Sequence, residues 1–288
     1  MAKRTVGMIG LGIMGSAMAA NLLRAGFRVV GYDPQAACRR RLTRAGGIAV
    51  GSAGEVAAAA TVIIASLPSA KALEMTSKAI KGRNIVVETS TLPIPVKEAA
   101  RRRLAAAGVT LLDCPLSGTG AQARTGDLVV FASGVFSEYK KTIPVLKGFS
   151  RSQYHLGRFG NGSKMKFAAN LLVAIHNVST AEAVILARRS GLDPALAVKV
   201  LGDGAGASRM LQVRGPLMVR RSYLPATVTN ETWRKDMTII GAFVRRLRSP
   251  APLFSATKRV YNAAMAQGHA RHDTAAVCAV LEKQGRKK

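Results

Sequence analysis

Residues 5–33 read TVGMIGLGIMGSAMAANLLRAGFRVVGYD, and this stretch decides the fold. A β-rich run at 5–9 ends in the glycine pattern GLGIMG, which opens an apolar helical stretch. The first glycine allows a tight turn, the second lets backbone N–H groups approach a pyrophosphate, and the third lets the helix pack on the strand. We therefore expect a dinucleotide-binding loop made by Gly10, Gly12, Ile13, Met14 and Gly15.

Asp33 closes the second expected strand, where dinucleotide-binding units place an acidic residue. Its carboxylate can accept hydrogen bonds from both hydroxyls of a ribose and would repel a 2′-phosphate. Pro34, and not an arginine, follows it. These residues predict NAD rather than NADP as the cofactor. The alternative is that Asp33 is only a turn or N-cap residue before Gln35.

The first half of the chain alternates β-rich runs with helical stretches rich in alanine and arginine. This alternation predicts βαβ units and a mostly parallel, doubly wound sheet. The expected strands cover residues 5–9, 28–32, 61–66, 84–88, 109–113, 128–133 and 153–156. We therefore expect a Rossmann-type α/β domain that binds a dinucleotide at 1–160.

The second half of the chain is predicted to be all-helical, because strand signals stop after Gly160. From Ser163 to Arg189 apolar residues recur close to the helical period, which predicts one long helix. Gly, Pro and Ser residues separate the helical segments that follow. We expect an all-α domain at 161–288 that begins with a long interdomain helix.

The composition is that of a folded protein of 288 residues and about two domains, with 48% hydrophobic and 20% charged residues. Its 3 cysteines form no short-spaced pair, and its 4 histidines have no metal-ligand spacing. No metal is therefore expected. Glycines interrupt the apolar run near the N-terminus, which argues against a signal peptide or membrane helix. We expect a cytoplasmic protein without membrane association.

The net charge is +28, from 43 basic and 15 acidic residues, and both halves of the chain share the excess. Basic charge alone is compatible with nucleic-acid binding, because phosphate contacts need only Lys and Arg. Aromatic residues make up only 5% of the chain and do not alternate with the arginine clusters. The favoured interpretation is a general surface charge that attracts anions weakly, so a nucleic-acid partner is not expected.

The segment Gly10–Gly26 resembles the signature of the β-hydroxyacid dehydrogenases, the group of 3-hydroxyisobutyrate dehydrogenase and tartronate semialdehyde reductase. Three further blocks resemble family motifs in the same order: DCPLSG at 113–118, GNGSKMKFAAN at 160–170, and Lys235-Asp236. The resemblance therefore covers essentially the whole chain. It implies hydride transfer between a nicotinamide cofactor and a small 3-hydroxy acid or its semialdehyde, by a homodimer or homotetramer.

A hydride can leave an alcohol carbon only as the hydroxyl proton is removed, so the reaction needs one positioned acid/base. The resemblance assigns this role to Lys166. Asn170, four residues later on the same helical face, would orient the substrate hydroxyl or the Lys166 amine. The alternatives are an ordinary helix lysine, an imine reductase, and a non-catalytic or DNA-associated scaffold on the same fold. Imine reductases and scaffolds of this fold tend to lack the lysine, so Lys166 favours the dehydrogenase.

The family's substrate loop corresponds to Ser117, Gly118 and Thr119, whose hydroxyl and N–H groups would receive a carboxylate. The family usually has a second glycine where Thr119 stands, so we expect a smaller or redirected pocket. Lys235 would reach the cofactor or the substrate carboxylate, and the alternative is a surface pair with Asp236. On the nicotinamide side, the resemblance implies cofactor contacts from Leu67, Pro68 and Thr91.

Overall fold

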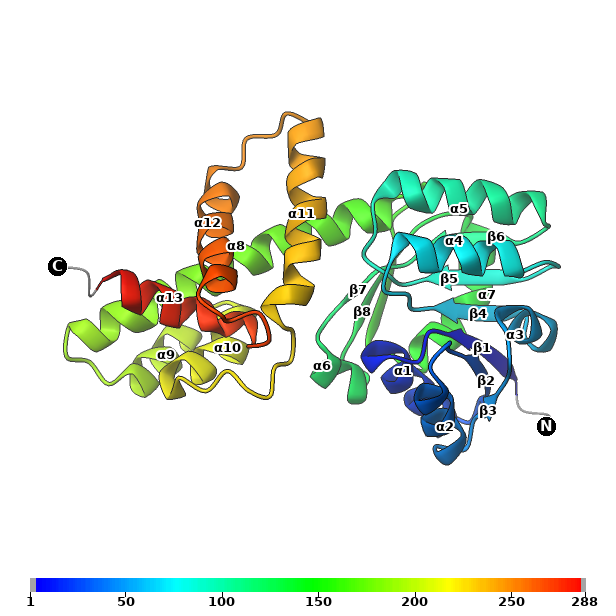
Figure 1. The fold of residues 1–288 in the computed structure, drawn as a ribbon, viewed down its shortest axis with the longest axis horizontal. Coiled ribbons are helices and arrows are strands. Elements are labelled where there is room, and N and C mark those ends of the chain that lie inside the picture. Colours follow the sequence, from blue (N-terminus) through cyan, green and yellow to red (C-terminus); the bar gives the residue numbers. More distant parts are fainter. Residues whose placement is uncertain (1–3, 286–288) are drawn as a thin grey trace. The chain divides into compact units, whose positions relative to one another are not determined.

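The computed structural model describes residues 4–285, and the chain divides into two compact units, 1–166 and 167–288. The first unit is an α/β domain and the second is helical, as the sequence predicts (Figure 1). The division falls inside the long helix α8 (Asn161–Arg189), between Lys166 and Phe167. The first turn of α8 therefore belongs to the α/β unit, although the sequence analysis places the boundary at 160.

The α/β unit is built on a 6-stranded parallel sheet with the order β3-β2-β1-β4-β5-β6. The strands are β1 (Thr5–Ile9), β2 (Arg28–Tyr32), β3 (Ile48–Ala49), β4 (Val62–Ala65), β5 (Ile85–Glu88) and β6 (Thr110–Asp113). The order reverses between β1 and β4, where Ile9 pairs with Ala65. Open α/β sheets bind ligands outside the carboxyl ends of their strands at such a point. The GLGIMG loop follows β1 and therefore lies at this point.

Helices cover both faces of this sheet. Neighbouring residues of one strand point to opposite faces, and apolar side chains are buried on each. Val86 and Leu111 belong to one buried hydrophobic cluster, whereas Val87 and Leu112 belong to a second. The strands are therefore apolar almost throughout, as expected for a sheet buried on both faces. The helices are α1 (Ile13–Arg24), α2 (Ala36–Arg44), α3 (Ala53–Ala59), α4 (Ala70–Ala79) and α5 (Ile94–Ala106).

A 3-stranded sheet of order β7-β8-β9 follows β6. In it β7 (Leu116–Ser117) pairs antiparallel with β8 (Val129–Ala132), which pairs parallel with β9 (Ser152–His155). The sequence analysis treats β8 and β9 as the last strands of one sheet. They form a separate sheet, which is joined to β6 by an antiparallel bridge between Asp113 and Ser133. The connecting helices are α6 (Gly120–Arg124) and α7 (Phe136–Lys147).

The helical unit contains most of α8 and the helices that pack on it. They are α9 (Pro194–Asp203), α10 (Arg209–Arg220), α11 (Asn230–Arg246), α12 (Pro252–Ala266) and α13 (Val277–Gln284). Its helix α8 buries Ala174, Val178, Ala181 and Val184 at helical spacing. By length and composition alone α8 could cross a membrane. The core helix of a soluble protein passes the same test, so this is weak evidence for a membrane span.

Candidate active site

Each glycine of the GLGIMG loop has its own structural reason. Gly10 has φ +87°, and a Cβ there would lie 2.1 Å from the Ser66 carbonyl oxygen. A Cβ on Gly15 would lie 1.9 Å from the Gly10 carbonyl oxygen, so both positions exclude a side chain. At Gly12 a Cβ would meet nothing within 4 Å. Gly12 is also the N-cap of α1 and supplies no side-chain cap, so the N-terminal N–H groups of α1 can receive a phosphate there.

The other expected cofactor residues lie around the same edge of the sheet. Ile13 begins α1 and is exposed, whereas Met14 packs against the core. Leu67 follows β4, and its N–H donates to Ser90 Oγ at 2.8 Å, which ties the loop after β4 to the loop after β5. The two loops also carry Pro68 and Thr91. The structure therefore brings these residues to the carboxyl ends of adjacent strands.

Asp33 follows β2, and its buried carboxylate reaches the glycine loop. Its Oδ2 accepts a hydrogen bond from the Leu11 N–H at 2.8 Å, and its Oδ1 accepts one from the Gln35 N–H at 2.8 Å. An ionised carboxylate has about four lone-pair sites, so each oxygen keeps the capacity to accept a ribose hydroxyl. The turn role and the ribose role expected from the sequence are therefore compatible.

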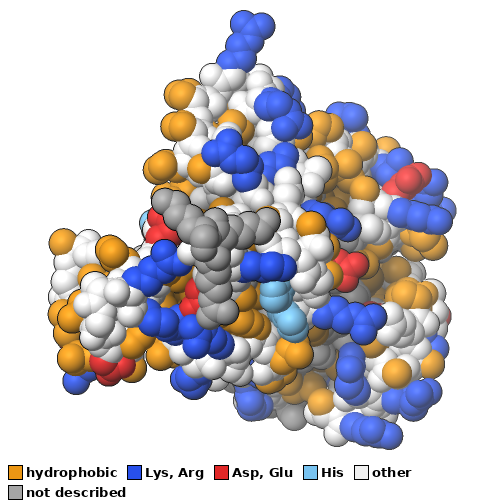
Figure 2. All heavy atoms as spheres, turned by 60° about the vertical axis from the view of Figure 1, so that its left-hand side comes forward, with side chains coloured by type: hydrophobic (Ala, Val, Ile, Leu, Met, Phe, Trp, Pro, Cys, Tyr) orange, Lys and Arg blue, Asp and Glu red, His pale blue; other side chains and the backbone are white. Residues whose placement is uncertain are grey.

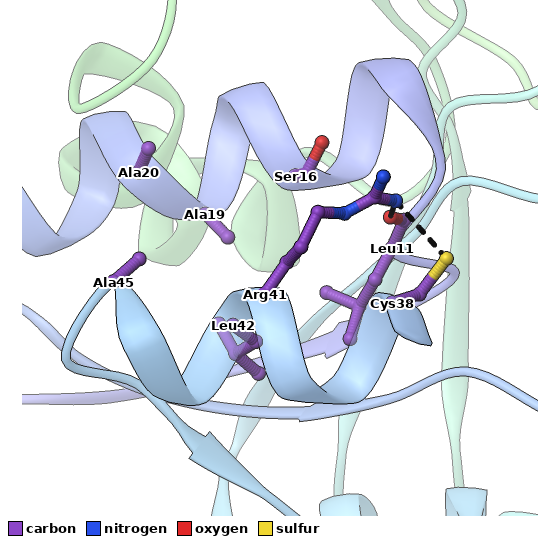
Figure 3. Close-up of a pocket in the computed structure, with 8 residues that line it drawn as sticks. All are labelled: Leu11, Ser16, Ala19, Ala20, Cys38, Arg41, Leu42 and Ala45. Atoms are coloured by element: carbon purple, nitrogen blue, oxygen red, sulfur yellow. Dashed lines mark hydrogen bonds between the residues drawn. The ribbon is translucent and has the colours of Figure 1, made fainter. Parts of the chain in front are cut away.

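Two arginines of α2 contact this region, Arg39 at the Asp33 turn and Arg41 at the glycine loop. Arg39 Nη1 donates to the carbonyl oxygen of Asp33 at 2.7 Å and to that of Pro34 at 3.1 Å. Arg41 reaches from α2 to the Leu11 carbonyl oxygen at 3.3 Å (Figure 3). The residue directly after Asp33 gives no sign of either arginine, because it is the helix α2 that returns them to the loop.

A small cavity lies between α1 and α2 beside Arg41 (Figure 3). Its volume is about 100 Å³, and it is lined by Leu11, Ser16, Ala19, Ala20, Cys38, Arg41, Leu42 and Ala45. Pockets for organic ligands usually measure about 300 to 1,000 Å³. This cavity is therefore too small for an adenosine and is distinct from the open space at Gly12.

The expected substrate loop runs from β7 into α6. Gly118 has φ +137°, and a Cβ there would lie 2.5 Å from Leu128 Cδ2, so the position requires glycine. Thr119 is the N-cap of α6: its Oγ1 accepts from the Gln122 N–H at 3.5 Å, and Gln122 Oε1 accepts from the Thr119 N–H at 3.0 Å. Thr119 therefore uses its hydroxyl and N–H in a capping box, and Ser117 lies half-buried before it.

The helix α6 is fixed to α1. Asn21 Nδ2 donates to the Ala123 carbonyl oxygen at 2.6 Å, and Arg24 Nη2 donates to the Arg124 carbonyl oxygen at 2.9 Å. These contacts satisfy carbonyl groups at the C-terminal end of α6. The helix that follows the dinucleotide loop therefore also sets the position of the expected substrate loop.

The first turn of α8 explains the glycines of the GNGSKMK motif. Gly160 has φ +91°, and a Cβ on Gly162 would lie 2.2 Å from the Phe131 carbonyl oxygen. The helix therefore approaches the strand backbone as closely as glycine allows. Lys166, one turn later on α8, is buried.

A buried group of charges, here called the sheet-edge cluster, consists of Lys97, Glu88 and Asp113. Lys97 Nζ lies 2.7 Å from Glu88 Oε2 and 2.7 Å from Asp113 Oδ1, and all three side chains are 0% exposed. Burial alone would lower the pKa of Lys97, but Asp113 and Glu88 outweigh it and hold this pKa above its ordinary value. The sequence analysis misses the cluster, although Glu88 and Asp113 each close an apolar strand as charged residues.

Burial also raises the pKa of the Cys114 thiol, and Asp113 adds to this shift. Cys114 is 0% exposed and follows β6 directly. A neutral, buried thiol is a poor nucleophile. Cys114 therefore acts as an apolar core residue next to the sheet-edge cluster.

In the helical unit, Asn170 is held by a residue of α11. Asn170 Nδ2 donates to Asp236 Oδ2 at 3.0 Å, and both lie within the second unit. Lys235 Nζ lies 3.6 Å from Asp236 Oδ1, and 41% of its side chain is exposed. The sequence analysis names Asp236 only as a neighbour of Lys235, and no local pattern connects it with Asn170.

Two family descriptions match consecutive parts of the chain. Residues 5–157 match the NAD binding domain of 6-phosphogluconate dehydrogenase, and residues 160–281 match the family described as NAD-binding of NADP-dependent 3-hydroxyisobutyrate dehydrogenase. The chain belongs to the β-hydroxyacid dehydrogenase family.

This dehydrogenase family member is similar to its relatives over nearly the whole chain. L-threonate dehydrogenase of Cupriavidus necator is 32% identical over 97% of this chain and 96% of its own. Mitochondrial 3-hydroxyisobutyrate dehydrogenase of Mus musculus is 29% identical over 98% and 88%. The crystal structure of 3-hydroxyisobutyrate dehydrogenase from Salmonella typhimurium has a TM-score of 0.87 at 27% identity, and the match covers 96% of this chain and 100% of that one. These similarities confirm the expected family and fold class, and they confirm that the chain is an NAD(P)-dependent dehydrogenase.

The structure describes residues 4–285 of this dehydrogenase. Within this range, no group of three or more His, Cys, Asp or Glu residues could hold a metal ion. In the α/β unit the candidate site residues lie on the dinucleotide loop, the substrate loop and the first turn of α8, and in the helical unit they lie on α8 and α11.

Proposed function

We propose that this chain oxidises a small 3-hydroxy acid, or reduces its semialdehyde, with Lys166 as the general acid/base. The observation that carries the proposal is the buried lysine one turn beyond the glycine-anchored start of α8. A nicotinamide ring, when bound, supplies the hydride chemistry. The protein must move the hydroxyl proton, and a positioned lysine amine can do so.

Asn170 is proposed to orient the reacting hydroxyl or the Lys166 amine. An ionised carboxylate only accepts hydrogen bonds, so the atom of Asn170 that contacts Asp236 Oδ2, at 3.0 Å, must be the donor Nδ2. This leaves Asn170 Oδ1 as the atom that accepts from the hydroxyl or the amine. Lys235 is proposed to contact the cofactor or the substrate carboxylate.

The proposed substrate is a short acid whose carboxylate binds Ser117 and Gly118. The Thr119 N–H donates to Gln122 Oε1 at 3.0 Å, so the loop offers the substrate the Ser117 hydroxyl and the Gly118 N–H. The names of the relatives point to L-threonate and 3-hydroxyisobutyrate as acids to test.

NAD(H) is the proposed cofactor, bound by the glycine loop, Leu67, Pro68 and Thr91. Asp33 is the charged group closest to the loop, through its 2.8 Å contact with the Leu11 N–H, and it would repel a 2′-phosphate. Arg39 and Arg41 act in the opposite direction, because they would attract that phosphate. We give Asp33 the larger effect because its carboxylate lies where the ribose is expected, held there by the Leu11 and Gln35 N–H groups.

The chain is further proposed to act in the cytoplasm, as a homodimer or homotetramer, and without a nucleic-acid partner. Lys and Arg side chains lie scattered over the face drawn in Figure 2, among hydrophobic and uncharged groups. A nucleic-acid site is expected to gather basic residues on one stripe or patch. The distribution on this face therefore favours a general surface charge.

The experiment is a screen of the wild-type chain with short 3-hydroxy acids, including L-threonate and 3-hydroxyisobutyrate, and either NAD⁺ or NADP⁺. The absorbance of the reduced nicotinamide reports turnover. We expect at least one acid to be oxidised, and faster with NAD⁺. Turnover of none, together with salt-dependent binding of duplex DNA, would favour the scaffold alternative.

A further inference from the structure

The first turn of α8 is fastened to the sheet by hydrogen bonds. The first N–H groups of a helix have no partner inside the helix. The Gly162 N–H donates to Ser133 Oγ at 2.9 Å, and the Ser163 N–H donates to Asp113 Oδ2 at 2.8 Å. Ser163 Oγ also donates to Asp113 Oδ1 at 2.8 Å. The Asp113 carboxylate therefore accepts hydrogen bonds from both the main chain and the side chain of Ser163, and acts as an N-cap supplied by another element.

Asp113 is itself held from behind by the sheet-edge cluster. Lys97 on α5 lies between Asp113, which ends β6, and Glu88, which ends β5. Glu88 Oε1 accepts from the Ser90 N–H at 2.9 Å, so its position is fixed as well. A buried ion cluster is weak evidence for stability, because desolvation offsets the attraction between the charges. A requirement for exact placement of Asp113 explains the cluster better.

The cluster also has the right sign for its place. Two carboxylates surround one ammonium group, so the cluster is net negative beside the N-terminus of α8. The dipole of a helix favours negative charge at that end. A Cβ added to Gly162 would lie 2.2 Å from the Phe131 carbonyl oxygen, so the glycine lets the helix end lie close to the strand backbone.

We propose that Asp113, held by Lys97 and Glu88, is the positioning residue that fixes the first turn of α8 and thereby aims Lys166. Ser163 and Lys166 are three residues apart on α8, so they are neighbours on the helix surface. A rotation of the first turn therefore moves the amine with it. The proposal rests on the proposed role of Lys166 as the acid/base.

The test begins with Ser163→Ala, which removes the hydroxyl donor to Asp113 and keeps the N–H donor. We expect kcat to fall about tenfold, while KM and the Kd for NADH stay within about twofold, because misplacement of the catalytic group affects the chemical step. The matched control is Ser150→Ala. Ser150 is a buried serine of the same unit whose Oγ donates to the Leu146 carbonyl oxygen at 2.7 Å, away from α8. It should keep the wild-type kcat.

A second variant, Lys97→Met, removes the cation that holds Asp113. If Lys97 and Ser163 both act through Asp113, the fold decrease in kcat of the double variant should be smaller than the product of the fold decreases in the two single variants. Hydrogen exchange of the amides at 162–164 gives a readout that needs no turnover. Exchange should quicken in Ser163→Ala and in Lys97→Met, but not in Ser150→Ala.

The outcomes separate this proposal from the proposed function. Wild-type kcat and wild-type exchange in Ser163→Ala would overturn the positioning role, and so would equal losses of kcat in Ser163→Ala and Ser150→Ala. Wild-type turnover by Lys166→Met would instead overturn the acid/base assignment. If Lys166→Met loses turnover while Ser163→Ala keeps the wild-type kcat and exchange, the proposed function is supported and only the positioning role is overturned.

Discussion

Each unit of the molecule buries a charged group of side chains, and the two groups serve different parts of the structure. The sheet-edge cluster lies at the carboxyl ends of β5 and β6, against the turn that precedes Lys166. In the helical unit, Asp273 accepts from Arg214 Nε at 3.2 Å, from Thr227 Oγ1 at 2.7 Å and from the Ala275 N–H at 3.0 Å. It thereby joins α10, the segment before α11 and the turn before α13. Of these two groups, it is the sheet-edge cluster whose partners lead to the motif residues of α8.

The two groups also respond oppositely to pH. The pKa of Lys97 is raised in the folded protein. The stability that the charged Lys97 gives to the α/β unit is therefore fully present below its ordinary pKa of 10.5, and it is lost as the pH rises through the folded-state pKa. Burial alone would raise the pKa of Asp273, but Arg214 and the hydrogen bonds of Thr227 and Ala275 lower it. Its stabilisation is present above the ordinary value of 3.8 and is lost as the pH falls through the folded-state value. Acid should therefore weaken the helical unit, and alkali the α/β unit.

The largest expected effect is that of Arg214→Met. The variant leaves Asp273 buried without its cation, which should cost the helical unit about 3–5 kcal/mol. Trp233 is the single tryptophan and lies in this unit, so its fluorescence during urea unfolding reports on it. Binding of NADH, measured by nicotinamide fluorescence, should persist because the dinucleotide loop belongs to the other unit. Arg221→Met, at a half-exposed ion pair, is the control and should cost less than about 1 kcal/mol.

A smaller effect is expected from acid. As the pH falls towards and below 3.8, the helical unit should lose the stability that Asp273 provides, and Trp233 fluorescence at fixed urea should show it. The loss is smaller than that in Arg214→Met, because the protonated carboxyl keeps part of its hydrogen bonding. Asp273→Asn should weaken this pH dependence. Identical acid transitions in wild type and Asp273→Asn would assign the acid response to another group.

The next effect is the cofactor preference that the Asp33 carboxylate of the α/β unit should produce. We expect kcat/KM to be at least about tenfold higher with NAD⁺ than with NADP⁺, equivalent to about 1.4 kcal/mol. Asp33→Asn should reduce this ratio, because Arg39 and Arg41 remain to attract the 2′-phosphate. Glu74→Gln, which removes a carboxylate from α4 of the same unit, should leave the ratio unchanged. A preference of wild type for NADP⁺ would contradict the role of Asp33.

The smallest effect is expected at the substrate loop. Thr119→Ala removes the N-cap of α6 and should destabilise the α/β unit by about 1 kcal/mol, whereas Thr119→Ser should keep the cap. Because α6 follows Gly118, loss of the cap should also alter the relative kcat/KM values for different hydroxy acids. Thermal unfolding and the same substrate screen measure both effects. An unchanged substrate profile in Thr119→Ala would separate position 119 from the substrate.

The sequence predicts the elements whose signals are local. The strand at Thr5–Ile9 and the glycine loop are found where the sequence places them, because a short β-rich run and a tight turn are set by neighbouring residues. The sequence does not reveal the short helices α3 and α6, because so few residues give no clear helical period. The helix α7 contains Pro144, which local signals treat as a helix breaker.

The parts of the candidate site that the sequence does not reveal depend on contacts that form only when the elements fold and pack. Lys97 meets Asp113 only after β5, α5 and β6 have folded together, and Asp236 reaches Asn170 across 66 positions of the chain. Arg39 returns to Asp33 through the turn of α2. Motifs therefore locate the residues expected to carry out the chemistry, whereas the residues that hold them in place emerge only from the fold.

The assignment of Lys166 is tested most directly by comparing Lys166→Met with Lys164→Met on an acid that the wild type oxidises. Lys164 is exposed and donates to Asn161 Oδ1 at 3.0 Å, two residues away from Lys166 on another face of α8. We predict that Lys166→Met binds NADH like the wild type but turns over about 10² to 10⁴ times more slowly, the usual contribution of general acid–base catalysis. Lys164→Met should stay within a few-fold of wild type. Equal kcat values for wild type and Lys166→Met would contradict catalysis by Lys166.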